Sequence, residues 1–382
     1  MKVQVPQYIR SLVPYVPGKP IEETQRELKI KKVVKLASNE NPLGPSPKSV
    51  LAIQKTLQGL HRYPDASGFR LKEALSKRLK LTPSSFILGN GSNEIIDQLI
   101  RTFCLAGDAI VTTQAAFIAY KICAQIHGVK TLETRLNESL KCDGDELVSL
   151  VRQNEKVRMV FIANPNNPTG TYLSASELRK LIVELSLIRD GSVLLVLDYA
   201  YWEYVTAPDL PDPMDTLKEY PNVVILRTFS KIYGLAGLRV GYGISSPELI
   251  GHLEKVRQTF NVNSLGLVGA EAALLDNAFV KNAKKVNQAG LKFWEKQLQR
   301  RSVPFWESQG NFILVDVQKG FGLSGMEVYQ SCLKQGVIFR PVANYGLTHA
   351  LRISIGTLAE NQRGLRALDL LKNKPNQARS KK

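Results

Sequence analysis

Residues 227–243 read RTFSKIYGLAGLRVGYG and directly follow the apolar run NVVIL. The apolar run predicts a buried β-strand, and the glycine-rich stretch after it predicts a loop of small side chains. Two cations stand in that loop, Lys231 and Arg239. A neutral lysine is a nucleophile and an arginine binds anions, so the two cations are either solvated charges on a surface turn or part of a site for a reactive, anionic ligand. The rest of the chain decides between these two interpretations.

Strands and helices alternate around this loop from about residue 47 onward, which is typical of a parallel sheet with crossover helices. The stretch SFILGNGSNEIIDQLIRTF (85–103) predicts a strand, a glycine loop and a helix with one apolar face. RMVFIANPNNPTG (158–170) and SVLLVLDYAYWEY (192–204) each predict a strand that ends in a polar segment. SASELRKLIVELSL (174–187) predicts a helix that begins at a serine cap.

Polar residues follow the carboxyl ends of four predicted strands: Gly91-Ser92-Asn93, Asn167, Asp198 and Ser230-Lys231. In open α/β sheets, ligands bind in the crevice outside those ends, so we expect these groups to converge. The loop GNGSNE opens a helix whose free N–H groups favour a phosphate, although it lacks the third glycine of a dinucleotide fingerprint. Asp198 needs a cationic or hydrogen-bond-donating partner, because a buried lone carboxylate is costly.

These groups together match the chemical needs of pyridoxal 5′-phosphate. Its aldehyde requires a lysine amine, and its pyridine nitrogen requires an acidic partner such as Asp198. Its phosphate suits helix-terminal amides and Arg239, its phenolic oxygen suits a donor such as Asn167, and its ring suits an aromatic neighbour such as Phe117. Each residue taken singly has an ordinary structural explanation, and Phe117 and Tyr120 in AAFIAY alone are typical core aromatics. Only the combination of these residues therefore predicts a site for pyridoxal 5′-phosphate.

The chain also resembles a known family. SKIYGLAGLRVGYG, NPNNPTG, LASNENPLGPSP and LRISIGT are similar to motifs of the fold type I aminotransferases, specifically the histidinol-phosphate aminotransferase family. The resemblance runs from about Val5 to Leu370. It implies an α/β fold: a fold type I pyridoxal-phosphate-dependent transferase with a mainly parallel central sheet sandwiched by helices, plus a smaller α+β domain.

The resemblance implies a role for each residue that matches a family motif. Lys231 would carry the cofactor and Asp198 would pair with its pyridinium nitrogen. Asn167 and Tyr201 would donate to its phenolic oxygen, while Phe117 would stack on its ring. The phosphate-binding residues implied are Thr228, Ser230 and Arg239 with the amides of Gly91, Ser92 and Asn93.

The resemblance also implies a substrate end and a partner. Tyr15, Arg340 and Arg352 match positions that hold the anionic end of the substrate. Tyr63, in RYPDASG, matches a tyrosine that reaches the phosphate site of the neighbouring subunit, which implies a homodimer with shared active sites. The implied activity is transamination between histidinol phosphate and 2-oxoglutarate, giving imidazole acetol phosphate and L-glutamate in histidine biosynthesis. A guanidinium fork suits phosphate and carboxylate alike.

Three departures from the family pattern bear on substrate preference. Asn93 in GSNE stands where the family usually has an acid, Tyr199 in DYAY stands where it usually has a glutamate, and TTQAAF lacks the usual proline before the aromatic. Other readings share the fold and cofactor: an aromatic-amino-acid aminotransferase or, in a different class, a threonine-phosphate decarboxylase. A regulator that only binds the cofactor would need a reading motif for nucleic acid, which we do not find.

Domain organisation follows from the change of pattern along the chain. Beyond residue 256 long helical segments precede the short strands NFILVDV, GVIFR and LRISIGT. We expect an N-terminal arm (1–46) that packs with the small domain, a large cofactor-binding domain (47–255), a small C-terminal domain (256–371) and a flexible basic tail (372–382).

Composition is that of a globular protein with an ample core. The chain has 382 residues, 44% hydrophobic and 22% charged, with a formal net charge of +17. The charge favours small anionic substrates over nucleic acid, because no nucleic-acid-reading motif accompanies it. The four cysteines show neither CxxC nor metal spacing, and the N-terminus lacks the continuous apolar segment of a signal peptide. We therefore expect reduced thiols, no metal, no membrane segment and a cytoplasmic location.

Overall fold

A seven-stranded sheet forms the centre of the larger part of the molecule in the computed structural model, which describes residues 3–210 and 212–372. The strand order is β2-β8-β7-β6-β5-β3-β4, and only β8 runs antiparallel to its neighbours. The predicted mainly parallel sheet is therefore confirmed. The strands are β2 (Phe86–Asn90), β3 (Ala109–Thr113), β4 (Lys130–Thr134), β5 (Val157–Ala163), β6 (Leu194–Asp198), β7 (Val223–Thr228) and β8 (Val240–Ile244).

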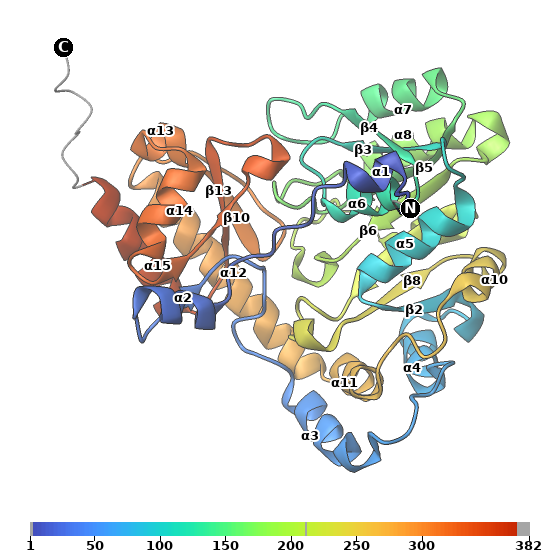
Figure 1. The fold of residues 1–382 in the computed structure, drawn as a ribbon, viewed down its shortest axis with the longest axis horizontal. Helices are drawn as coiled ribbons and strands as arrows, with labels where there is room; N and C mark the ends of the chain where they lie inside the picture. The colour runs from blue at the N-terminus through green and yellow to red at the C-terminus, as the bar shows by residue number, and fades with distance from the viewer. Residues whose placement is uncertain (1–2, 211, 373–382) are drawn as a thin grey trace.

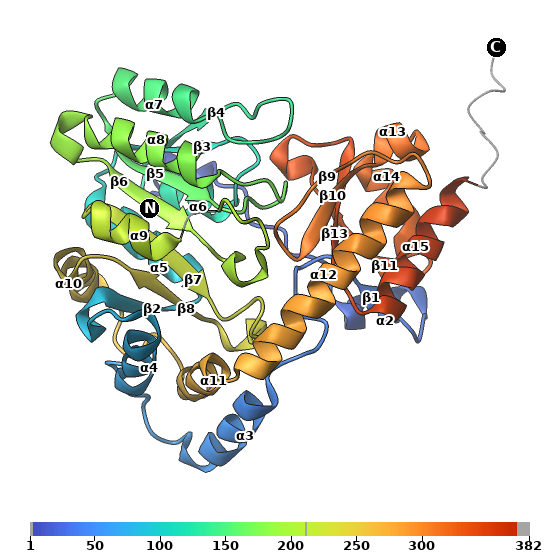
Figure 2. The same cartoon turned by 180° about the vertical axis from the view of Figure 1, so that it is seen from behind.

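Helices cover both faces of this sheet because alternate strand residues point to opposite sides (Figures 1 and 2). In β6, Leu195 and Leu197 pack into one core, whereas Leu194 and Val196 pack into the other. The first core lies under α4 (Phe69–Leu79), α7 (Gly144–Gln153), α8 (Ala175–Ser186), α9 (Pro213–Glu219) and α11 (Ser264–Leu274). The second lies under α5 (Ser92–Phe103), α6 (Ala119–Ile126) and α10 (Pro247–Val256).

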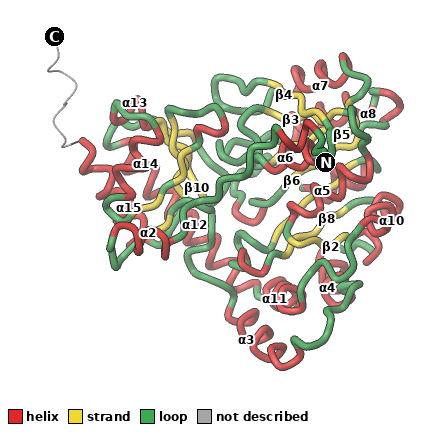
Figure 3. Tube along the Cα trace, viewed as in Figure 1, coloured by secondary structure: helices red, strands yellow, loops and turns green. Residues whose placement is uncertain are grey.

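A smaller unit is built on an antiparallel sheet of order β12-β13-β10-β9 (Figure 3). Its strands are β9 (Phe305–Trp306), β10 (Phe312–Asp316), β12 (Arg340–Pro341) and β13 (Ala350–Ser354). The helices beside it are α13 (Val317–Phe321), α14 (Gly325–Leu333) and α15 (Leu358–Lys372). This α+β unit has its own apolar core around Trp294 and Phe339.

The N-terminal arm runs along both units. It contains α1 (Gln7–Arg10), α2 (Ile21–Leu28) and β1 (Val34–Lys35), and α3 (Pro47–Thr56) follows it. Strand β1 pairs in parallel with β11 (Val337–Ile338) of the small unit, and α1 contacts α6 of the large unit. The arm thus passes between the units at residues 36–46.

The long helix α12 (Asn277–Gln299) joins the two units (Figure 2). Its first part packs Ala283 into the large unit's core, and its last part packs Trp294 and Leu298 into the small unit's core. Helix α11, which precedes it, packs on α3 and α4. Within α12 the apolar contacts therefore change from the core of the large unit to the core of the small unit. The domain boundaries proposed from the sequence stay a prediction. The predicted basic tail lies outside the described residues from residue 373 on.

Strand β8 was missed by the sequence analysis because its sequence, VGYGI, is rich in glycine. The structure gives a reason for one of these glycines. A Cβ on Gly241 would lie 2.4 Å from the backbone nitrogen of Ser92, so only glycine allows the start of α5 to come this close to β8. Among the described residues, no helix is long and apolar enough to cross a membrane.

Candidate active site

A cavity opens at the carboxyl ends of the parallel strands, where ligands bind in open α/β sheets. The groups predicted to converge do so there. The residues that line the cavity are Ser92, Asn93, Phe117, Ala163, Pro165, Asn167, Asp198, Ala200, Tyr201, Thr228, Ser230, Lys231 and Arg239. They come from the ends of β5, β6 and β7, from the start of α5 and from the segment before α6.

Lys231 projects from the loop after β7 and is half-buried. Its Nζ lies 5.6 Å from the centre of the Tyr201 ring. Burial lowers the pKa of Lys231 to about 8, helped by the positive charges of Arg352 and Arg239 and opposed by Glu40 and Asp198. A substantial fraction of this amine is therefore neutral near physiological pH, as a nucleophile requires.

Asp198 is the last residue of β6 and is buried. The Tyr120 hydroxyl donates to its Oδ2 at 2.8 Å, and the Ala200 backbone N–H donates to its Oδ1 at 3.0 Å. Burial raises the pKa of Asp198, while these two hydrogen bonds and the charge of Lys231 act in the opposite direction. The carboxylate is fixed in place and faces the cavity, where a cationic ring nitrogen would neutralise it.

One end of the cavity is built to receive an anion. Ser92 and Asn93 begin α5, so their backbone N–H groups have no partner within the helix. Arg239 Nη1 donates to Ser230 Oγ at 3.3 Å, and Thr228 Oγ1 accepts from the Ser230 backbone N–H at 3.1 Å. Gly91 belongs to this end although it does not line the cavity: a Cβ there would lie 2.5 Å from Arg239 Nη2.

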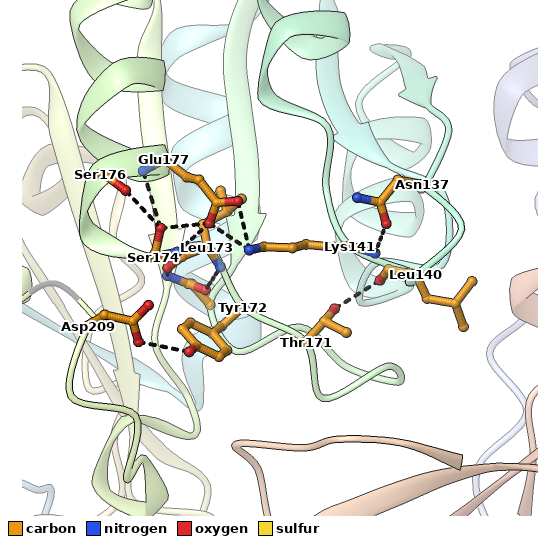
Figure 4. A network of polar contacts seen from close by, with 11 residues as sticks. Asn137, Leu140, Lys141, Thr171, Tyr172, Leu173, Ser174, Ser176, Glu177 and Asp209 are labelled. Carbon is orange, nitrogen blue, oxygen red and sulfur yellow. Dashed lines mark hydrogen bonds and ion pairs between the residues drawn. The ribbon is translucent and has the colours of Figure 1, made fainter. Parts of the chain in front are cut away.

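Asn167 lies in a loop that is held from several sides. Arg352 Nη1 donates to Asn167 Oδ1. The far end of the loop is fixed by Thr171 Oγ1, which donates to the Leu140 carbonyl at 2.9 Å (Figure 4). Tyr172 donates to Asp209 at 2.8 Å, and Ser174 forms the capping box that begins α8, as its sequence predicted. The loop thus presents Asn167 to the cavity from a fixed backbone.

The aromatic side chains sit on two sides of the cavity. Phe117 is half-buried and meets Tyr120 edge to face at 5.7 Å between ring centres. Tyr201 is buried, and its hydroxyl accepts a hydrogen bond from Asn39 Nδ2 at 3.0 Å. Tyr199, beside Asp198, is also buried and packs edge to face on Trp202. The tyrosine that replaces the usual glutamate therefore belongs to the apolar core.

The predicted substrate residues lie next to the cavity without lining it. Arg352 is 6% exposed, and its Nη2 donates to the Ala37 carbonyl at 2.6 Å. Arg340 is its direct partner across β12 and β13, so both side chains share one face of the small sheet. Arg340 Nη2 donates to the Val16 carbonyl at 3.1 Å, and its guanidinium lies 5.8 Å from the ring centre of Tyr15.

Tyr63 lies outside the cavity of its own chain. It is 82% exposed and stacks on Phe260 with 4.7 Å between ring centres. Its predicted role in the site of a neighbouring subunit stays a prediction.

Sequence reasoning missed Tyr120 and Asn39 as members of the site. Tyr120 was interpreted as a typical core aromatic, and its spacing gave no sign that its hydroxyl reaches Asp198 across 78 residues of chain. Asn39 lies within the motif LASNENPLG, so a signal was present, but the motif alone does not say which side chain it contacts.

The family is shown by comparison with known proteins. Residues 31–368 match the family model described as aminotransferase class I and II. The chain belongs to this family. A histidinol-phosphate aminotransferase of Anaeromyxobacter sp. (strain Fw109-5) is 43% identical over 364 residues, which cover 95% of this chain and 98% of that protein. Histidinol-phosphate aminotransferase 2 of Pseudomonas fluorescens (strain Pf-5) is 45% identical over 94% of this chain and 95% of that protein.

Solved structures share the fold. The crystal structure of histidinol-phosphate aminotransferase from Sinorhizobium meliloti in complex with pyridoxal 5′-phosphate has a TM-score of 0.86 at 27% identity, covering 97% of this chain and 98% of that one. An aspartate aminotransferase of Thermus thermophilus has a TM-score of 0.84 at 18% identity, covering 97% of this chain and all of that one, and shares the fold alone.

The cavity fits pyridoxal 5′-phosphate by the chemistry of its donor groups. An amine with a lowered pKa, Lys231, and a buried carboxylate, Asp198, face the same space. The start of α5 and the Arg239 guanidinium offer N–H donors for a phosphate at one end. The close approach at Gly91 and Gly241 leaves the backbone there accessible to such a group, since a side chain on either glycine would collide with these donors.

Proposed function

We propose that this aminotransferase is a histidinol-phosphate aminotransferase that uses pyridoxal 5′-phosphate. The reaction exchanges an amino group between histidinol phosphate and 2-oxoglutarate, giving imidazole acetol phosphate and L-glutamate, a step of histidine biosynthesis. The observation that carries the proposal is the likeness to proteins of that name, at 43–45% identity over 94–95% of this chain. The placement of Lys231 and Asp198 in one cavity supports the cofactor.

The residues of the chain divide the chemical work. When bound, the cofactor withdraws electrons from the substrate's Cα, which makes that carbon acidic. Lys231 Nζ would hold the cofactor, and the same nitrogen would accept the proton from the substrate's Cα, because its lowered pKa leaves it partly unprotonated. Asp198 keeps a proton on the ring nitrogen, and the two hydrogen bonds to its carboxylate hold it there. Asn167 and Tyr201 orient the ring through its phenolic oxygen.

Arg340 and Arg352 support recognition of both substrates. Histidinol phosphate carries a phosphate and no carboxylate, whereas glutamate carries two carboxylates. The two guanidinium groups lie on one face of the small sheet beside the cavity, and each can bind either anion through paired N–H donors. One arginine pair therefore serves both halves of the reaction.

A two-substrate assay tests the proposal. Purified protein is supplied with pyridoxal phosphate and 2-oxoglutarate, and glutamate formation is compared between histidinol phosphate and phenylalanine. We expect a higher kcat/KM for histidinol phosphate, a yellow protein, and loss of the cofactor absorbance in Lys231→Ala. Preference for phenylalanine would favour an aromatic-amino-acid aminotransferase. Release of carbon dioxide from threonine phosphate without transamination would favour the decarboxylase.

We also propose a homodimer with shared active sites. Tyr63 is 82% exposed, and large apolar side chains on and near α3, such as Leu51, Leu57 and Leu60, are about half exposed, as expected of a surface that a second subunit covers. Mixing Tyr63→Ala with Lys231→Ala should recover up to about a quarter of the wild-type activity, because half of the random pairs carry one intact site. Absence of recovery, with dimers seen by ultracentrifugation, would remove Tyr63 from the shared site. The cytoplasmic location stays a prediction from the cysteine content.

A further inference from the structure

Asn39 lies at the crossing of the two units and has no role in the function described above. It is 1% exposed, and its φ of 55° is a left-handed conformation that asparagine tolerates better than most residues. It belongs to the segment that leads from β1 to α3. A buried polar residue with a strained backbone, next to a ligand cavity, indicates a position held for a purpose.

The small unit fixes Asn39 through its backbone and its side-chain oxygen. The Asn39 backbone N–H donates to Ser354 Oγ at 2.8 Å, and its carbonyl accepts from Asn311 Nδ2 at 2.9 Å. Ser354 Oγ in turn donates its own proton to Asn39 Oδ1 at 2.7 Å. Because Oδ1 is committed to Ser354, the amide nitrogen Nδ2 is turned the other way, toward the large unit.

That nitrogen meets the hydroxyl of Tyr201 at 3.0 Å. An amide N–H only donates, so Tyr201 Oη must accept at this contact. The hydroxyl's single proton is then left for another acceptor, and Tyr201 lines the cavity. We propose that Asn39 is a positioning residue that holds the Tyr201 hydroxyl as an acceptor and thereby directs its proton to the phenolic oxygen of the cofactor. The inference rests on the proposed function.

Several charged and polar groups around Asn39 act on the protonation of Lys231 and Tyr201. Lys231 faces Asp198 from β6, Glu40 from the arm, Arg239 from its own loop and Arg352 from β13. Tyr201 faces Arg352, Asp198 and the hydroxyl of Tyr15. Replacing Asn39 leaves all of them in place. Asn39→Asp adds one negative charge, which is present with and without the Tyr201 hydroxyl, so comparing the two Tyr201 backgrounds separates its effect from that of the hydroxyl.

The test is a spectroscopic pH titration of the holoenzyme. The titration follows the absorbance change as the nitrogen that links Lys231 and the cofactor loses its proton, and its midpoint is the pH at which half of that proton is lost. A hydrogen bond to the phenolic oxygen reduces the negative charge that stabilises this proton. Loss of the hydrogen bond therefore raises the midpoint. Asn39→Asp is isosteric and still accepts from Ser354, but its carboxylate accepts the Tyr201 proton instead of donating. We expect its midpoint to rise by about one pH unit, as in Tyr201→Phe, consistent with one hydrogen bond to a charged group.

The double variant separates positioning from general damage. In the Tyr201→Phe background, Asn39→Asp should shift the midpoint by less than about half as much, because the hydroxyl through which Asn39 acts is gone. Asn39→Gly provides a second route if the aspartate variant does not fold, since glycine accepts a positive φ and keeps both backbone hydrogen bonds. It should raise the midpoint in the wild-type background and leave it unchanged beside Tyr201→Phe.

Asn361→Asp is the matched control. Asn361 is equally buried in the small unit and accepts from Trp294 Nε1 at 3.0 Å and the Gly356 N–H at 2.9 Å. It should lower the melting temperature without moving the midpoint. A wild-type midpoint in both Asn39 variants, or equal shifts in both backgrounds, would overturn the inference alone. A wild-type protein without lysine-dependent cofactor absorbance would overturn the proposed function with it.

Discussion

The cofactor end and the substrate end of the site are built in different ways. The cofactor end uses short segments at the ends of neighbouring strands of one sheet, and Asp198 and Thr228 there are buried. The substrate end takes Tyr15 from the arm and Arg340 and Arg352 from the small sheet. Tyr15 is 51% exposed, whereas Arg352 is 6% exposed.

This difference separates what is pre-formed from what depends on the relation of the two units. The strand ends that carry Asp198 and Thr228 are fixed by strand pairing within the large unit, so their backbone geometry does not require the small unit. Arg352 instead bonds both Asn167 of the large unit and Ala37 of the arm. Substitutions at the cofactor end should therefore abolish chemistry, and substitutions at the substrate end should change substrate binding.

The largest effect is expected at Asp198. Asp198→Asn removes the negative charge that holds a proton on the cofactor's ring nitrogen, so kcat should fall by about 10³-fold with little change in KM. Single-turnover kinetics of the holoenzyme measure this. Asp276→Asn is the control, because Asp276 is also buried and accepts from Ser46 Oγ at 2.6 Å, away from the cavity. Equal losses in the two variants would mean that Asp198 serves stability rather than catalysis.

A smaller effect, mainly on KM, is expected at Arg352. The substitution Arg352→Lys keeps the positive charge. A lysine ammonium cannot, however, donate to Asn167 and to the Ala37 carbonyl at once, as the planar guanidinium does. The KM for histidinol phosphate and for glutamate should both rise by about tenfold or more. Arg340→Lys should raise the KM values less, because Arg340 is more exposed than Arg352. Its hydrogen bond to the arm goes to the Val16 carbonyl. Unchanged KM values for either substrate in Arg352→Lys would exclude that assignment.

The same contrast explains what the sequence could predict. Asp198 ends a strand, and Asn167 and Lys231 lie in the loops that follow two neighbouring strands of the same sheet. The carboxyl ends of parallel strands meet at one edge, so local patterns predicted their convergence. The contact between Tyr120 and Asp198 depends on how α6 is rotated against the sheet, which an apolar helix face does not determine. The bond between Asn39 and Tyr201 depends on how two units meet, and no local pattern carries that information.

The family resemblance supplied the rest of the site. Arg340 and Arg352 stand in short segments without a distinctive chemical pattern, so their pairing across β12 and β13 became visible only in the fold. Strand β8 was missed for the opposite reason: its glycines, which weaken a strand signal, are needed so that α5 can approach.

The smallest effect concerns the pH dependence of cofactor attachment, and it connects the two ends of the site. Burial lowers the pKa of Lys231 to about 8 from 10.5, and the second cause is the charge of Arg352. The rate at which cofactor-free protein takes up pyridoxal phosphate should rise with pH, reach half of its maximum at about pH 8 and level off above that, because only the neutral amine attacks. Stopped-flow absorbance measures this rate.

Arg352→Met sharpens the test, because it removes a positive charge that disfavours protonation of Lys231. The midpoint should move upward by less than one pH unit, on the order of one charge pair in a partly solvated site. The lowered pKa also makes the stability of the cofactor-free protein depend on pH. The unfolded chain keeps the lysine proton up to about pH 10.5, whereas the folded chain loses it at about pH 8, so the free energy of unfolding increases as the pH rises from about 8 to 10.5. A wild-type rate that still increases at pH 10 would show that burial and the charge of Arg352 do not lower the pKa of Lys231 to about 8.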